Sequence, residues 1–156
     1  MIESWHDFFV ALAGATAALT GLLFVAVSIN LDRILALEGL PERALESLVL
    51  LLTTLIVSLL SLVPDQSAVA LGIELIVLGG ALGAFIANLR HGAVAMHAPR
   101  VVRVALPIVC TLPLIVGGAL LVTEAADGLL WVVGAAVAAI LTSVSNAWVL
   151  LVEILR

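Results

Sequence analysis

The fold of this chain is decided by residues 8–29, which read FFVALAGATAALTGLLFVAVSI and carry no charged side chain. A helix needs about 20 apolar residues to cross the hydrocarbon core of a bilayer, so this stretch is long enough for one crossing. Residues 1–7 contain no Lys or Arg, whereas a secretory signal peptide begins with a positive region. We therefore expect a retained transmembrane helix near the start of the chain.

The rest of the chain has the same apolar character. Of its 156 residues, 64% are hydrophobic and 11% are charged, whereas soluble domains average about 45–50% apolar and about 25% charged residues. A domain of this size still exposes a large surface, so a water-soluble fold cannot bury so many apolar side chains. The net charge is −5 and all six positive residues are Arg, which argues against a nucleic-acid-binding patch.

Four further apolar runs follow the first, separated by short polar links. Gly39 and Pro41 read as a helix stop followed by a helix start. Asp65 or Ser67 is the expected N-cap of the third long helix. Pro107 and Pro113 predict a kink or a break in the fourth. We predict an all-α bundle of five transmembrane helices in a single domain, over residues 8–38, 41–63, 67–89, 100–123 and 128–155.

The positive residues predict the orientation of the bundle. If the N-terminus lies outside, all six fall on the cytoplasmic side, as the positive-inside rule requires. They are Arg33, Arg43, Arg90, Arg100, Arg103 and Arg156. In that orientation Trp5 and Trp131 lie near the outer interface and Trp148 near the inner one. The expected location is the cytoplasmic (inner) membrane of a bacterium, with the lipid bilayer as surroundings and the C-terminus in the cytoplasm.

Small residues recur at helical spacing on two of the expected helices. They are Ala13, Ala17 and Gly21 in the first helix and Gly72, Gly79 and Gly83 in the third. Small residues allow transmembrane helices to approach closely. These faces fit packing within one subunit or an interface between subunits, and we expect a homo-oligomer that uses some of them.

Polar side chains mark two further helix faces. Ser47, Thr54, Ser58 and Ser61 follow one face of the second helix, and Asn146 lies in the cytoplasmic half of the fifth. Such hydroxyls can line a water-filled path, or bond to the preceding turn or to a neighbouring helix. All five are candidates for pore or ion-binding residues.

Glu74 is the one acid expected well inside a span. Gly72, Gly79 and Gly83 lie on the opposite face of the same helix, so Glu74 points away from the small-residue contact. An acid facing lipid is costly. Two interpretations stay open: an acid hydrogen-bonded to a hydroxyl such as that of Ser58 or Ser61, or an ion- or proton-binding position at a pore or subunit junction.

No motif predicts an enzyme or a metal site. His6 is expected outside and His91 and His97 inside, and the latter two with Cys110 match no zinc spacing. The chain contains no GxSxG or HExxH motif. We expect no catalysis, no cofactor, no metal and no nucleic-acid partner.

Two stretches of the first helix, residues 5–9 (WHDFF) and 21–35 (GLLFVAVSINLDRIL), resemble a family of uncharacterised small bacterial polytopic integral membrane proteins. The resemblance covers the first helix best, and it implies a multi-pass membrane fold without implying an activity.

Two functions are predicted. The first is a homo-oligomeric pore for ions or a small solute, because one subunit is too small to enclose much of a path alone. The alternative is a non-catalytic partner that regulates a larger membrane complex through its helix faces.

Overall fold

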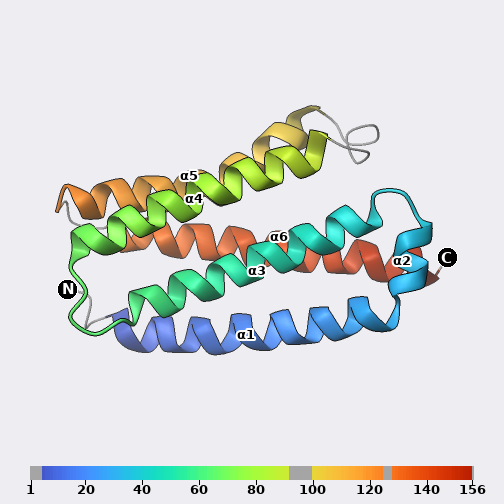
Figure 1. Cartoon of the computed structure of the whole chain (residues 1–156), viewed down its shortest axis with the longest axis horizontal. Coiled ribbons are helices and arrows are strands. Elements are labelled where there is room, and N and C mark those ends of the chain that lie inside the picture. Colours follow the sequence, from blue (N-terminus) through green and yellow to red (C-terminus); the bar gives the residue numbers. More distant parts are fainter. Residues whose placement is uncertain (1–4, 92–99, 125–127, 156) are drawn as a thin grey trace.

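The computed structural model of the protein describes residues 5–91, 100–124 and 128–155, which form six α-helices and no strand (Figure 1). The expected all-α fold is therefore confirmed. In chain order the helices are α1 (His6–Ile29), α2 (Leu31–Ala36), α3 (Leu40–Ser61), α4 (Ala68–His91), α5 (Arg100–Val122) and α6 (Gly128–Leu155).

The first helix is shorter than predicted. The expected helix over residues 8–38 is wrong at its end, because α1 stops at Ile29 and the short helix α2 follows it. Asn30 lies between them with φ −108° and ψ 17°, outside the helical region. Its side-chain Nδ2 donates a hydrogen bond to the carbonyl oxygen of Ala26 at 2.9 Å. That bond competes with the continuing helix, as short polar side chains commonly do.

The turn into α2 buries an apolar side chain that a straight helix would leave outside. Ile34 is 2% exposed and packs with Leu40, Ala44 and Leu150 at the end of the bundle where α3 begins. The chain then reverses at Gly39, whose φ of 81° is a conformation that residues with a Cβ rarely adopt. The helix stop and start predicted at this point are confirmed.

Two other boundary predictions have clear outcomes. The Ser67 hydroxyl accepts a hydrogen bond from the backbone N–H of Ala70 at 3.1 Å, so Ser67 rather than Asp65 caps α4. α5 runs as one helix through Pro107 and Pro113, so there is no break at these prolines, and a kink there stays a prediction. The connections 92–99 and 125–127 lie outside the described residues.

Helices α3 to α6 form a four-helix bundle, and α1 packs against the outer side of α3 (Figure 1). Within the bundle α3 contacts α4 and α6, and α5 contacts the same two helices. Seven of the buried residues on each of α3 and α6 follow alternating steps of three and four, the pattern of helices that cross at about 20°. They are Leu40, Ala44, Ser47, Leu51, Thr54, Ser58 and Ser61 on α3, and Leu129, Val132, Ala136, Ala139, Ser143, Asn146 and Leu150 on α6.

Glycines set the distance between α5 and both of its neighbours. A Cβ on Gly118 would lie 2.6 Å from the carbonyl oxygen of Gly72 on α4, and a Cβ on Gly117 would lie 2.8 Å from that of Gly128 on α6. Two consecutive glycines thus face two different helices. The pair Gly117–Gly118 was not among the predicted packing residues.

Four of the described helices, α1, α3, α4 and α6, are long and apolar enough to cross a membrane. In α5 the apolar helix found among the described residues is shorter, Ile108–Val122. The structure therefore supports a multi-pass membrane protein. The fifth span and the orientation of the termini stay predictions.

Candidate functional site

The predicted hydroxyl face of α3 lies in the core of the subunit. Ser47, Thr54, Ser58 and Ser61 are all buried. Each hydroxyl donates a hydrogen bond of 2.8–2.9 Å to the carbonyl oxygen four residues earlier in the same helix. Each of these hydroxyls therefore has a hydrogen-bond acceptor within α3 itself.

Polar residues meet in the α3–α6 contact beside Ser47. The Ser143 hydroxyl on α6 donates a hydrogen bond to the Ser47 carbonyl oxygen at 3.2 Å. One turn further along α6 lies Asn146, which is 9% exposed and whose amide Nδ2 is buried without a partner among the described residues. Asn146 was predicted as a site residue, and the structure places it at the end of the bundle where α3 begins.

A small void lies in the middle of the four-helix bundle. It offers about 10 Å³ for the centre of a water molecule, roughly enough for one molecule. Thr53, Thr54 and Cys110 line it together with apolar residues that include Leu50 and Leu114. Elsewhere the core consists of closely packed Leu, Val, Ile and Ala side chains. At this size the void is not itself a path across the bundle.

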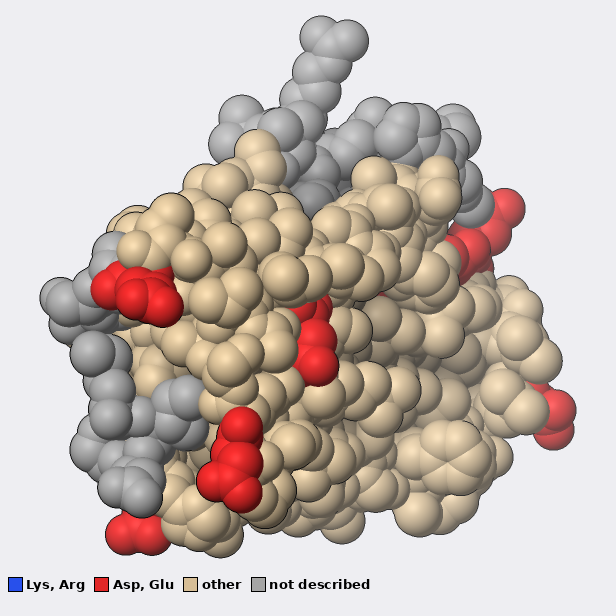
Figure 2. All heavy atoms as spheres, turned by 60° about the vertical axis from the view of Figure 1, so that its left-hand side comes forward, with Lys and Arg blue, Asp and Glu red and all other residues tan. Residues whose placement is uncertain are grey.

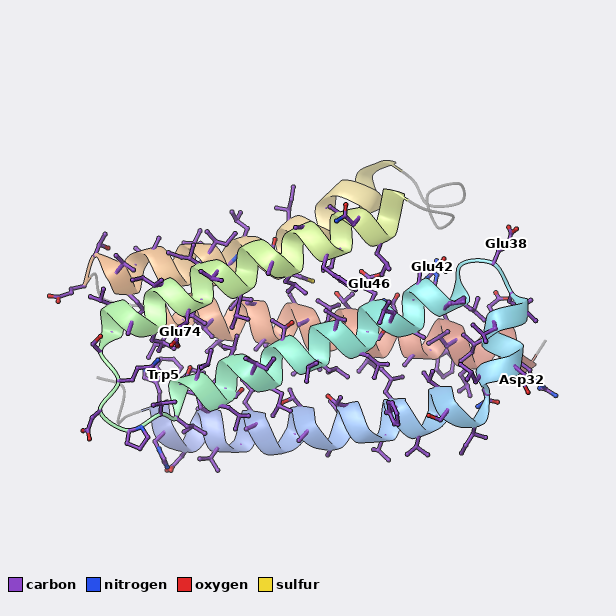
Figure 3. All side chains as sticks on the ribbon, viewed as in Figure 1. Trp5, Asp32, Glu38, Glu42, Glu46 and Glu74 are labelled. Carbon is purple, nitrogen blue, oxygen red and sulfur yellow. The ribbon has the colours of Figure 1, made fainter. Side chains whose placement is uncertain are left out.

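Glu74 bonds to the link between α3 and α4. The amide Nε2 of Gln66 donates a hydrogen bond of 2.7 Å to Glu74 Oε2, and both side chains are half-buried. Among the described residues no hydrogen bond joins Glu74 to Ser58 or Ser61, whose hydroxyls bond within α3. Glu74 points toward the neighbourhood of Trp5 in Figure 3.

Glu46 is a second acid inside the bundle and was not predicted. It is 4% exposed, although it lies in the first turn of the apolar run 45–63, where an acid normally reaches water. The signal was its spacing: Leu50 and Val57, both buried, follow it by four and eleven residues on one helix face. One turn earlier, Glu42 has a carboxylate oxygen, Oε2, that is buried without a partner among the described residues.

The predicted packing residues divide between the core and the surface. Gly72, Gly79 and Gly83 face α5, where a Cβ would lie 2.6, 2.9 and 3.6 Å from the nearest atom. Ala13 is buried against the subunit, whereas Ala17 and Gly21 are exposed.

The outer face of α1 carries two glycines in open space. A Cβ on Gly14 or Gly21 would meet no atom within 4 Å. α1 also carries large exposed apolar side chains, among them Leu22 (69% exposed) and Phe24 (62%). In the view of Figure 2 the acidic side chains are few and scattered over the molecular surface.

The residues that the structure describes contain no group of three or more His, Cys, Asp or Glu side chains placed to hold a metal ion. His97 and the side chain of His91 lie outside the described part. Comparison of the chain with protein-family models, with curated proteins and with solved structures finds no match.

Proposed function

We propose that the protein is a non-catalytic integral membrane protein that acts by associating through α1 with other transmembrane helices, in the first place those of further copies of itself. The observation that carries this proposal is the one-sided packing of α1. This helix packs mainly against α3, and a Cβ built on Gly14 or Gly21 would meet no atom of the described residues within 4 Å.

The cost of glycine supports an interface on this face. Glycine in a helix interior is less favourable than alanine by about 1 kcal/mol. On a helix face that contacts only lipid, no closer packing between helices offsets this cost. Gly14 and Gly21 are seven residues apart, two helical turns, and therefore lie on one face of α1. Close approach of a second helix is the benefit that small residues bring in a membrane.

If the protein forms the predicted pore, this proposal puts the conducting path between subunits of the oligomer and not inside one subunit. The hydroxyls of α3 are satisfied within the helix, and the void of the bundle holds about one water molecule. We keep the conducting assembly as a prediction, together with a bacterial inner-membrane location and the N-terminus outside. The arginine distribution supports that orientation.

Association can be tested on the full chain in lipid nanodiscs. Gly14→Leu combined with Gly21→Leu is expected to shift the population from oligomers to monomers, read by native mass spectrometry or by counting photobleaching steps. Gly80→Leu is the matched control, because Gly80 on α4 is equally open. A wild-type chain that is monomeric at every protein density, or an equal loss with Gly80→Leu, contradicts the proposal.

Two outcomes separate the alternatives. Wild-type oligomers that conduct in planar bilayers support the pore between subunits. A monomer that copurifies in fixed stoichiometry with a larger membrane protein, and loses it with the double α1 variant, favours the partner function instead.

A further inference from the structure

The short helix α2 lies across the end of the bundle, turned away from the direction that the long helices share (Figure 1). The turn comes directly after α1, whose 24 residues extend over about 36 Å at about 1.5 Å per residue. The hydrocarbon core of a bilayer is about 30 Å thick, so α1 is long enough to cross it before the chain turns. A helix that crosses this core brings α2 to the boundary between acyl chains and headgroups.

The six residues of α2 divide into an apolar side and a charged side. Ile34 is buried against the bundle, whereas Leu31 is 46% exposed and Leu35 is 63% exposed. At about 100° per residue, Leu31 lies about 60° and Leu35 about 100° from Ile34, in the same direction around the helix axis. Asp32 lies about 160° from Ile34, on the opposite face. An apolar face opposite a charged one is the pattern of a helix that lies in the plane of a membrane interface.

The exposed leucines of α2 continue the lipid-facing surface of α1. The last residue of α1, Ile29, is 77% exposed, and α1 is apolar enough to cross a membrane. Asn30 is the only residue between Ile29 and Leu31. Because the two exposed surfaces are joined through this one residue, lipid is the surroundings that they share.

We infer that α2 is an interfacial helix, which lies at the boundary between headgroups and acyl chains with Leu31 and Leu35 inserted among the lipids and Asp32 toward water. The contact is apolar and does not select the charge of the headgroup, because α2 carries one acid and one base, Asp32 and Arg33. The turn at Asn30 thereby marks the edge of the hydrocarbon, and α2 fixes how deeply this end of the bundle lies in the membrane.

Spin labels on the full chain in phosphatidylcholine vesicles test this placement. Leu31→Cys and Leu35→Cys are labelled separately in a Cys110→Ser background. Power-saturation EPR then compares collisions of each label with oxygen, which concentrates in lipid, and with a water-soluble nickel chelate. Both labels are expected to give an oxygen-to-chelate ratio several-fold above that of a label in water. Phe24→Cys, at an exposed position within the α1 span, is the control for a label in the hydrocarbon.

The matched controls for water are Asp32→Cys on the other face of α2 and Glu38→Cys just after it, both at exposed positions. Their labels should collide mainly with the chelate. If the Cys110→Ser chain does not fold, Cys110 is retained, since its thiol is buried, and the labelled parent chain serves as the blank.

Three results would overturn the inference. A ratio at Leu35 equal to that at Glu38 would place α2 in water. Few collisions with both reagents would show that protein, such as a second copy of the chain, covers the leucines. Ratios at Leu31 and Leu35 that rise only when phosphatidylglycerol is added would show a contact that depends on headgroup charge, whereas unchanged ratios are expected.

Discussion

Gly72 on α4 and Gly118 on α5 face each other so closely that a Cβ built on either would lie 2.6 Å from the carbonyl oxygen of the other. At that point the backbone of each helix lies directly against the backbone of the other, with Val122 and Ile76 packed beside the contact. Real Cβ contacts are never this short, so a larger residue at either position must push the helices apart. Because neither glycine has a Cβ, α4 and α5 can approach this closely at Gly72 and Gly118.

Gly118→Ala should destabilise the protein by about 1–3 kcal/mol, the usual cost of overpacking a close contact. Unfolding in detergent, followed by circular dichroism, measures the change. Gly80→Ala is the control, since Gly80 lies on α4 with no atom within 4 Å of its Cβ position, and it should be neutral or slightly stabilising. If Gly118→Ala and Gly80→Ala change the free energy of unfolding equally, the close contact between Gly72 and Gly118 is wrong.

Ser143→Ala should weaken the contact between α6 and α3. The Ser143 hydroxyl donates to the Ser47 carbonyl oxygen across the interface, and hydrogen bonds between transmembrane helices contribute about 0.6 kcal/mol on average. Ser145→Ala removes an exposed hydroxyl that donates only to Leu141 in its own helix. If Ser143→Ala lowers the free energy of unfolding no more than Ser145→Ala does, the hydrogen bond between Ser143 and Ser47 does not stabilise the bundle.

The sequence predicted the apolar helices well because lipid imposes a length and a composition on them. It failed where a local side chain competed with the helix: Asn30 ends α1, although the apolar pattern continues past it. It also failed at Gly117, Gly118 and Glu46, whose roles depend on which helix lies opposite. Hydropathy identifies which residues are apolar. Which helix lies opposite a given residue is set by the packing of the whole bundle, and hydropathy does not report it.

Ile34→Ala tests the turn into α2. Ile34 is fully packed at the end of the bundle, so truncation should cost about 2 kcal/mol or more through lost burial and a cavity. Leu35→Ala, at the adjacent exposed position, should leave the unfolding midpoint unchanged. A straight first helix in solution would reverse this expectation, because Ile34 would then project beyond the bundle and tolerate truncation.

The predicted orientation can be read with single cysteines in a Cys110→Ser background. Asp65 lies in the α3–α4 link and Glu38 precedes α3, and both are exposed. With the N-terminus outside, Asp65→Cys should react with a membrane-impermeant maleimide in intact cells, and Glu38→Cys only after permeabilisation. The opposite labelling pattern would place the N-terminus in the cytoplasm.

Glu74 and Gln66 offer the last test, because their hydrogen bond of 2.7 Å gives the half-buried acid a structural explanation that needs no ion. On that explanation, Glu74→Ala and Gln66→Ala should be coupled by about 1 kcal/mol, since removing either side chain leaves the other polar group half-buried without this bond. Glu74→Gln retains a polar group in reach of Gln66 and should unfold close to the wild-type midpoint.

Glu124→Gln, an exposed substitution, is the control and should show no coupling to Gln66. The ion-binding interpretation makes a different prediction for Glu74→Gln, which removes the titratable charge. Compared with wild-type assemblies, assemblies of Glu74→Gln would then differ in the amplitude, pH dependence or ion preference of conductance or flux. Coupling to Gln66 together with unchanged transport would make Glu74 a structural acid. Altered transport without coupling would make it part of a path between subunits.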